Sequence, residues 1–298
     1  PILLMNNFTL YMIASEKAGL SLVCSVAGGV LNMALDYALI AVFDMGIGGA
    51  AVATGLGYSV TAVAGLFVFS RKKSLLHFTK PAFRGKVLAG AATNGCSEMA
   101  TALVTGIITM MFNWTMLRYV GEDGVAAVTI IMYVLMFASS LYTGYSYGVA
   151  PMISYYYGEQ NDEKLKKLIQ VSLRVIAGIS LATVGASFLL TRPLVSVFAR
   201  PDNPVYPLAV TGNRICTIAL FFIGFNIFAS GMFTALSNGV ISAVLAFSRS
   251  FVFMLVTMLV LPILFGVNGI WLATPAAELM ALALSAFMFL KYRKRYGY

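Results

Sequence analysis

Three acidic residues, Asp36, Glu98 and Glu278, lie inside long apolar runs of this 298-residue sequence. A carboxylate inside a bilayer is expensive, so each is a functional candidate by default. The chemistry open to such a group is the binding of a monovalent cation or of a proton. The alternative for each is a neutral acid that hydrogen-bonds to a neighbouring helix as a structural contact.

Asp36 has the clearest polar neighbours. Asn32 precedes it by four residues, so both side chains lie on one helix face, one turn apart. Thr54 lies in the next, antiparallel apolar run, and we expect it and Asp36 at one depth, roughly 10 Å below the outer surface. A carboxylate, an amide oxygen and a hydroxyl together predict a partial oxygen site for Na⁺ or for a proton.

The other two acids are predicted near the bilayer midplane. Asn94 precedes Glu98 by one helical turn. Glu278 follows Pro275, and its alternative role is to satisfy the backbone group that the proline leaves without a hydrogen bond. Either acid is a secondary candidate for a cationic substrate or a coupling proton.

Aromatic side chains offer a weaker signal. Tyr142 and Tyr145 are candidates to line a cavity for flat cations through cation–π contacts. The run 155–157 is better explained as an interfacial aromatic belt.

Composition identifies the elements that position these residues. The chain is 60% hydrophobic and only 10% charged, with a mean hydropathy of +0.87, whereas soluble domains carry roughly 25% charged residues. We therefore predict an all-α, polytopic transmembrane bundle. Full spans are expected at 18–43, 48–70, 87–117, 123–151, 167–193, 209–236, 239–266 and 268–291, with 1–13 as the end of one more.

The charges predict an orientation and exclude other classes of protein. The net charge is +9, but the basic residues fall in short loops, Arg249 being counted among them, which is typical of the positive-inside bias and not of nucleic-acid binding. The C-terminus is therefore expected in the cytoplasm. One loop histidine, His77, and three isolated cysteines argue against an enzyme, a metal site beyond Na⁺, or any cofactor.

The sequence also contains a parallel repeat. At an offset of 220, residues 1–58 align without gaps on 221–278, and identical pairs include Asn6/Asn226, Gly46/Gly266 and Thr54/Thr274. Two such halves are one way to build a transporter, with the substrate between them. The expected whole has twelve helices in two pseudo-symmetric lobes, with the first three helices and most of the fourth missing before Pro1. Residues 1–80 would complete the N-lobe and 81–298 would form the C-lobe.

Two stretches carry a family resemblance. The segment 30–36 (VLNMALD), followed by 46–54 (GIGGAAVAT), resembles the multidrug and toxic compound extrusion (MATE) family, and 261–275 (LPILFGVNGIWLATP) is similar to its matching C-terminal segment. The resemblance covers essentially the whole chain.

The resemblance implies a secondary active antiporter that exports organic cations in exchange for Na⁺ or H⁺ by alternating access. It places Asn32, Asp36 and Thr54 in the N-lobe ion site and Glu98 in a C-lobe position. The protein is expected in the plasma (inner) membrane of a bacterium or a similar cell, as a monomer. The alternative is a flippase of the same superfamily for a lipid or lipid-linked oligosaccharide, which should line its cavity with several basic residues; only Arg214 is a candidate.

Overall fold

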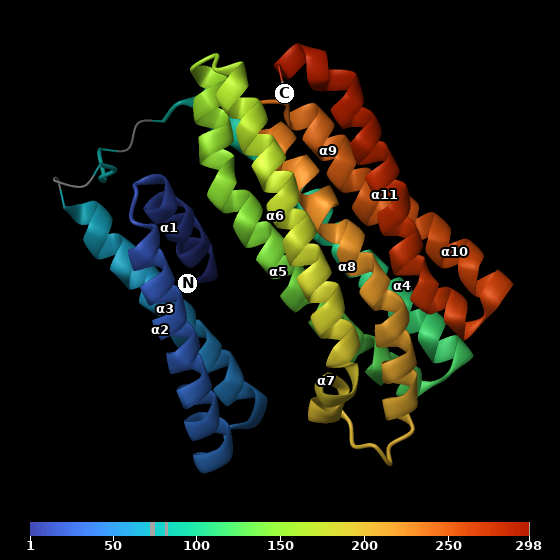
Figure 1. Cartoon of the computed structure of the whole chain (residues 1–298). Helices are drawn as coiled ribbons and strands as arrows, with labels where there is room; N and C mark the ends of the chain where they lie inside the picture. Colours follow the sequence, from blue (N-terminus) through green and yellow to red (C-terminus); the bar gives the residue numbers. More distant parts are fainter. Residues whose placement is uncertain (72–74, 81–82, 298) are drawn as a thin grey trace. The chain divides into compact units, whose positions relative to one another are not determined.

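The structure, a computed structural model, describes residues 1–71, 75–80 and 83–297, with the side chains of these residues except 86, 87, 89–102 and 294. Within these ranges every regular element is helical, which confirms the predicted all-α class (Figure 1). The elements are α1 (Ile2–Ala14), α2 (Ala18–Asp36), η1 (Tyr37–Val42), α3 (Gly46–Ser70), α4 (Gly85–Tyr119), α5 (Glu122–Gly158), α6 (Asp162–Leu189), α7 (Thr191–Phe198), α8 (Val205–Ala235), α9 (Gly239–Phe247), η2 (Ser248–Phe253), α10 (Met254–Phe265) and α11 (Val267–Tyr296).

Most of these helices have the length and composition to cross a membrane. In the described part of the chain there are 7 such spans, counting α2 with η1, and α9 with η2 and α10, as single spans. The predicted run 87–117 falls in α4. The predicted span 167–193 was wrong at its end, because α6 stops at Leu189 and the short α7 follows. The chain is a multi-pass membrane protein.

The chain divides into two compact units, unit 1 (Pro1–Gly85) and unit 2 (Lys86–Tyr298). In unit 1, α1 and α2 both pack on α3. The rings of Phe8 and Phe69 lie 5.6 Å apart, and Met12 is fully buried beside them. Gly65 leaves the space that the ring of Phe8 occupies.

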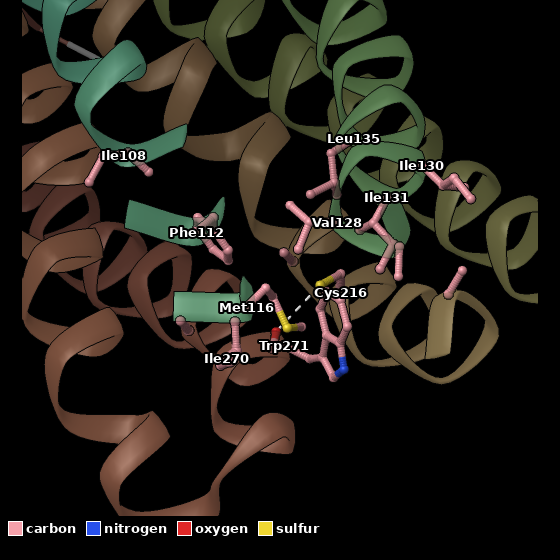
Figure 2. Packing of buried hydrophobic residues seen from close by; sticks show 14 of the residues in the cluster. Ile108, Phe112, Met116, Val128, Ile130, Ile131, Leu135, Cys216, Ile270 and Trp271 are labelled. Atoms are coloured by element: carbon pink, nitrogen blue, oxygen red, sulfur yellow. Dashed lines mark hydrogen bonds between the residues drawn. The ribbon is translucent and has the colours of Figure 1, made fainter. Parts of the chain in front are cut away.

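Unit 2 is organised around α8, which packs against α5, α6, α9 and α11. Figure 2 shows the larger of its cores, where Met116 of α4 lies beside Trp271 of α11 and Phe112 belongs to the same cluster. Cys216 of α8 donates its thiol hydrogen to the backbone oxygen of Trp271 at 3.4 Å. Because α8 packs against several helices, apolar residues occur around most of its circumference.

The helix boundaries recur at the offset of 220 residues. The spans 18–42 and 239–265 correspond to within three residues, and each is followed by a glycine with positive φ near the start of the next helix. Gly46 and Gly266 both have positive φ, +55° and +59°, a left-handed conformation that glycine adopts without a Cβ clash. The π-helical segments η1 and η2 do not correspond, since η2 would fall at 28–33 in the first half.

Candidate functional site

The polar residues of unit 1 are positioned by a close crossing of α2 and α3. Gly28 of α2 and Gly57 of α3 are both buried, and a Cβ built on Gly28 would lie 2.6 Å from the backbone oxygen of Gly57. A Cβ on Gly57 would lie 2.9 Å from the Cβ of Asn32. The two glycines therefore let the backbones approach and bring Asn32 against α3.

Asn32 and Thr54 meet across this crossing. The Asn32 Nδ2 donates to Thr54 Oγ1 at 3.5 Å, and the Thr54 hydroxyl donates to the backbone oxygen of Ala50 at 2.8 Å. Both side chains are half-buried. This hydrogen bond uses only the Nδ2 of Asn32 and not its Oδ1, which is an acceptor. Asn32 lies on the same face of α2 as Asp36.

Asp36 ends α2, one turn beyond Asn32, at the start of the π-helical segment η1. Its Oδ1 is buried and has no hydrogen-bond partner among the described residues. The six residues of η1 separate Asp36 from the turn at 43–45, and Thr54 lies eight residues after the start of α3, on the other side of that turn. Among the described residues, no direct hydrogen bond joins Asp36 to Asn32 or Thr54.

An oxygen-only set of this kind suits one small, hard cation or a proton. Two oxygen types, carboxylate and amide, face one side of α2, and the remaining ligands of a cation would have to be water or other oxygens. In the described residues no group of three or more His, Cys, Asp or Glu side chains comes close enough to hold a metal ion.

Unit 2 contains a second polar cluster, which we call the Glu278 cluster: Asn226, Arg249, Glu278 and Ser285. Arg249 Nε donates to Glu278 Oε1 at 2.8 Å and to Oε2 at 2.9 Å. Asn226 Nδ2 donates to Glu278 Oε2 at 2.8 Å, and Ser285 Oγ donates to Asn226 Oδ1 at 3.1 Å. The Glu278 carboxylate accepts the hydrogen bonds from Arg249 and from Asn226, which is the pattern of an ionised carboxylate, and Asn226 Oδ1 accepts the one from Ser285.

Arg249 lies deeper in its span than the charge pattern predicts. The pattern places it with the loop charges, but it lies in η2, ten residues inside the span 239–265. The partner of this charge, Glu278, lies 29 residues further along the chain on α11. The missed signal was the long apolar run before Arg249, which leaves no room for a loop at that point.

The remaining candidates fall into two groups. The side chains of Glu98 and Asn94 lie outside the described residues. Tyr142 is 1% exposed and its hydroxyl contacts Thr183 Oγ1 at 2.6 Å and the Leu220 backbone oxygen at 2.9 Å. Tyr142 is therefore packed in the larger core of unit 2, where Gly224 of α8 leaves room for its ring. Tyr145 is half-buried beside the second core of unit 2.

Comparison with known proteins gives consistent relatives. Residues 99–260, more than half of the chain, match the MatE family. The multidrug export protein MepA of Staphylococcus saprophyticus is 24% identical over 274 residues, covering 91% of this chain and 60% of the relative. MepA of Staphylococcus haemolyticus is 24% identical over 284 residues, covering 95% and 62%.

Solved structures share the fold. The outward-facing conformation of a multidrug resistance MATE family transporter of the MOP superfamily matches with a TM-score of 0.82 and 23% identity, covering 94% of this chain and 62% of that chain. An inward-facing conformation matches with a TM-score of 0.77 and 22% identity, covering 98% and 67%. The chain spans about 60% of the length of the curated relatives it matches. It belongs to the MatE family, the multidrug and toxic compound extrusion transporters that its motifs resemble.

Proposed function

We propose that this protein is a secondary active antiporter that exports organic cations and drugs in exchange for Na⁺ or H⁺, by alternating access between two lobes. Its relatives are named multidrug export proteins, which supports the class of substrate. It works without a cofactor and without catalysing a reaction, as a monomer in a bacterial plasma (inner) membrane.

One observation carries the ion-coupled part of this proposal: Asp36 Oδ1 is buried and has no hydrogen-bond partner in the described part of the chain. Buried polar atoms are nearly always hydrogen-bonded, so a buried oxygen without a partner requires an explanation. A coupling ion, bound by Asp36 together with Asn32 and Thr54, or a proton on the carboxylate, supplies the missing partner. The alternative, that Asp36 is a structural contact between helices, is weaker because the atom has no neighbouring donor among the described residues.

Ion binding would drive transport through a difference between two states. A ligand shifts a conformational equilibrium only by its differential affinity for the two conformations. We propose that the ion entering at Asp36 changes the packing of α2 on α3, at the Gly28–Gly57 crossing, and so favours release of substrate.

The test measures gradient-driven efflux of ethidium, a fluorescent cation, from proteoliposomes. The protein is made from the complete open reading frame that encodes the chain, and Na⁺ and pH gradients are imposed separately. We expect one gradient to drive efflux and Asp36→Asn to reduce that driven part by about tenfold or more, as for loss of a charged hydrogen-bonding group.

Asp44→Asn is the matched control. Asp44 is exposed in the turn after η1 and has a φ of 52°, which asparagine also tolerates. The same chemical change there should leave efflux as it is. If Asp36→Asn pumps like the wild type, the coupling site has to be sought at Glu98 instead.

The orientation is a separate part of the proposal. The C-terminal segment carries Lys291, Arg293 and Arg295, and such positive clusters favour the cytoplasmic side. A C-terminal green fluorescent protein fusion should be fluorescent and a C-terminal alkaline phosphatase fusion inactive. The reverse pair of results would place the C-terminus outside.

The flippase alternative gains one observation from the structure, since Arg249 lies within a span. A diphosphate would require several basic residues around a cavity, and Arg214, the other candidate, is exposed. A wild-type protein that moves no cation under either gradient, but transfers a lipid-linked diphosphate between leaflets, would favour the flippase.

A further inference from the structure

We propose that Arg249 is a binding site for the carboxylate group of a transported compound. The site lies in η2, inside the span 239–265 of unit 2, and so belongs to the other unit from Asp36. It rests on the proposed export function and deepens it, because it assigns one residue of the chain to the recognition of compounds that carry both a positive charge and a carboxylate.

Arg249 uses only one of its N–H donors within the described chain. Its Nε is the atom that contacts Glu278, at 2.8 and 2.9 Å. A guanidinium has five N–H donors, and the other four are on the two Nη atoms, which make no hydrogen bond within the described chain. The Arg249 side chain is 23% exposed and that of Glu278 only 7%, so the arginine keeps an accessible part that the carboxylate lacks. The two Nη atoms form the terminal edge of its guanidinium.

This terminal edge cannot face lipid. Arg249 lies ten residues from Gly239, about 15 Å along the span, which places it near the middle of the hydrocarbon core. Unpaired N–H donors are not tolerated in contact with hydrocarbon, and charged residues within spans face the bundle interior or a water-filled cavity. The Nη atoms of Arg249 therefore meet water, a polar ligand or a side chain outside the described residues.

The local backbone supports a binding role. Ser248 and Ser250 flank Arg249, and both are half-buried, so three polar residues interrupt a span whose mean hydropathy is 2.2. They lie in a π-helical segment, a distortion that recurs at functional sites because it re-aims side chains within a helix.

The chemistry of the open group selects an anion and not a cation. Glu278 already accepts hydrogen bonds from Arg249 and Asn226 on both oxygens, so it offers little to a cationic ligand. The two Nη atoms form a planar edge that matches the two oxygens of a carboxylate. Glu278 and Asn226 are positioning residues, because they hold the guanidinium in one orientation without reaching the ligand.

The pair Arg249–Glu278 makes this idea testable by the opposite effects of its two charges. Removing the arginine should abolish recognition of the carboxylate. Removing the glutamate charge should strengthen it, because the positive charge of Arg249 is then no longer compensated. A purely structural ion pair predicts that both changes act in the same direction.

The experiment compares two dyes that differ in one group: rhodamine 110, which has a free carboxylate, and rhodamine 123, its methyl ester. Fluorescence anisotropy measures the Kd of each for the purified protein, made from the complete open reading frame. The variants are Glu278→Gln and the double variant Arg249→Gln/Glu278→Gln, which leaves no unpaired buried charge. Arg174→Gln, at an exposed arginine of α6, is the matched control.

We expect the wild type and Arg174→Gln to bind the acid more tightly than the ester. The preference for the acid should fall about tenfold in the double variant, as for a lost charged hydrogen bond, and should rise in Glu278→Gln. Size-exclusion profiles and melting temperatures in detergent verify that each variant is folded.

Three results would overturn the proposal. Equal binding of acid and ester by the wild type removes the carboxylate site while leaving the export of organic cations intact. A preference that falls to the same extent in Glu278→Gln and in the double variant makes the pair structural. If the wild type binds neither dye, the proposed function itself fails, and the Arg249 site fails with it.

Discussion

Asn226 donates its amide to both the backbone oxygen and the carboxylate of Glu278, at 2.9 and 2.8 Å. The amide thus ties α8 to α11 at a position where the carboxylate also binds Arg249 of η2. Three segments that are distant in sequence are joined through one buried acid, which is why the stability of unit 2 should depend on it.

Asn226→Ala should destabilise the protein by about 1–3 kcal/mol, because it removes a donor to a buried charge and an acceptor for Ser285. Asn6 is the matched control, since it occupies the equivalent position of the repeat but is exposed. Asn6→Ala should change the free energy of unfolding by no more than about 0.5 kcal/mol. Chemical denaturation in detergent measures both, and equal losses would contradict a role for the Glu278 cluster.

Arg249→Gln and Glu278→Gln should each cost more than the two together. Removing one partner leaves an unpaired buried charge, with a penalty of about 3–5 kcal/mol for such pairs, whereas replacing both removes the charges altogether. The 23% exposure of Arg249 makes the penalty smaller for Glu278→Gln, whose remaining charge reaches the surface. A double-mutant cycle on thermal unfolding tests this, and strictly additive losses would count against an interacting pair.

Gly28→Ala should destabilise unit 1. The new methyl group would meet the backbone oxygen of Gly57 at 2.6 Å, and backbone cannot move aside as a flexible side chain does. We expect a cost of about 1–3 kcal/mol from overpacking.

The neighbouring Gly29→Ala is the control for this change. A Cβ there meets nothing within 4 Å, so alanine should be neutral or stabilise the helix by about 0.5–1 kcal/mol. A loss of stability in Gly29→Ala as large as that in Gly28→Ala would show that the crossing of α2 and α3 is not the cause.

Tyr142→Phe should lower the stability of unit 2 by about 1–2 kcal/mol, because the hydroxyl hydrogen bonds to Thr183 and Leu220 are lost in the core. Tyr147→Phe removes the same hydroxyl from a side chain that is 62% exposed, and its melting temperature should match the wild type. If Tyr142→Phe changes the affinity for a dye without lowering stability, Tyr142 lines the substrate cavity.

The two halves of the repeat carry different charges at corresponding places. The positions 220 residues before Arg249 and Glu278 are Gly29 and Tyr58, and those after Asn32 and Asp36 are Val252 and Val256. The shared backbone plan therefore holds an acid in unit 1 and an ion pair in unit 2. This asymmetry fits a protein in which one half couples an ion and the other recognises a substrate group.

The sequence by itself determined the class of protein, the order of the helices, the glycine turns of the repeat and the family. These follow from hydropathy and from local spacing, because a span needs only about 20 apolar residues and a helix face needs only a four-residue period. The pairing of Asn32 with Thr54 could also be anticipated, since consecutive antiparallel helices joined by a short turn place residues of equal depth side by side.

Only the tertiary structure decided which helix faces meet. It paired Arg249 with Glu278 and enclosed Tyr142 beside Gly224. It also left one oxygen of Asp36 without a hydrogen-bond partner among the residues that the structure describes. Hydropathy is nearly the same around the whole of helices such as α8, so it does not indicate which side packs on which neighbour. That choice depends on the combined shapes of side chains from several distant segments, and it appears only when they pack together.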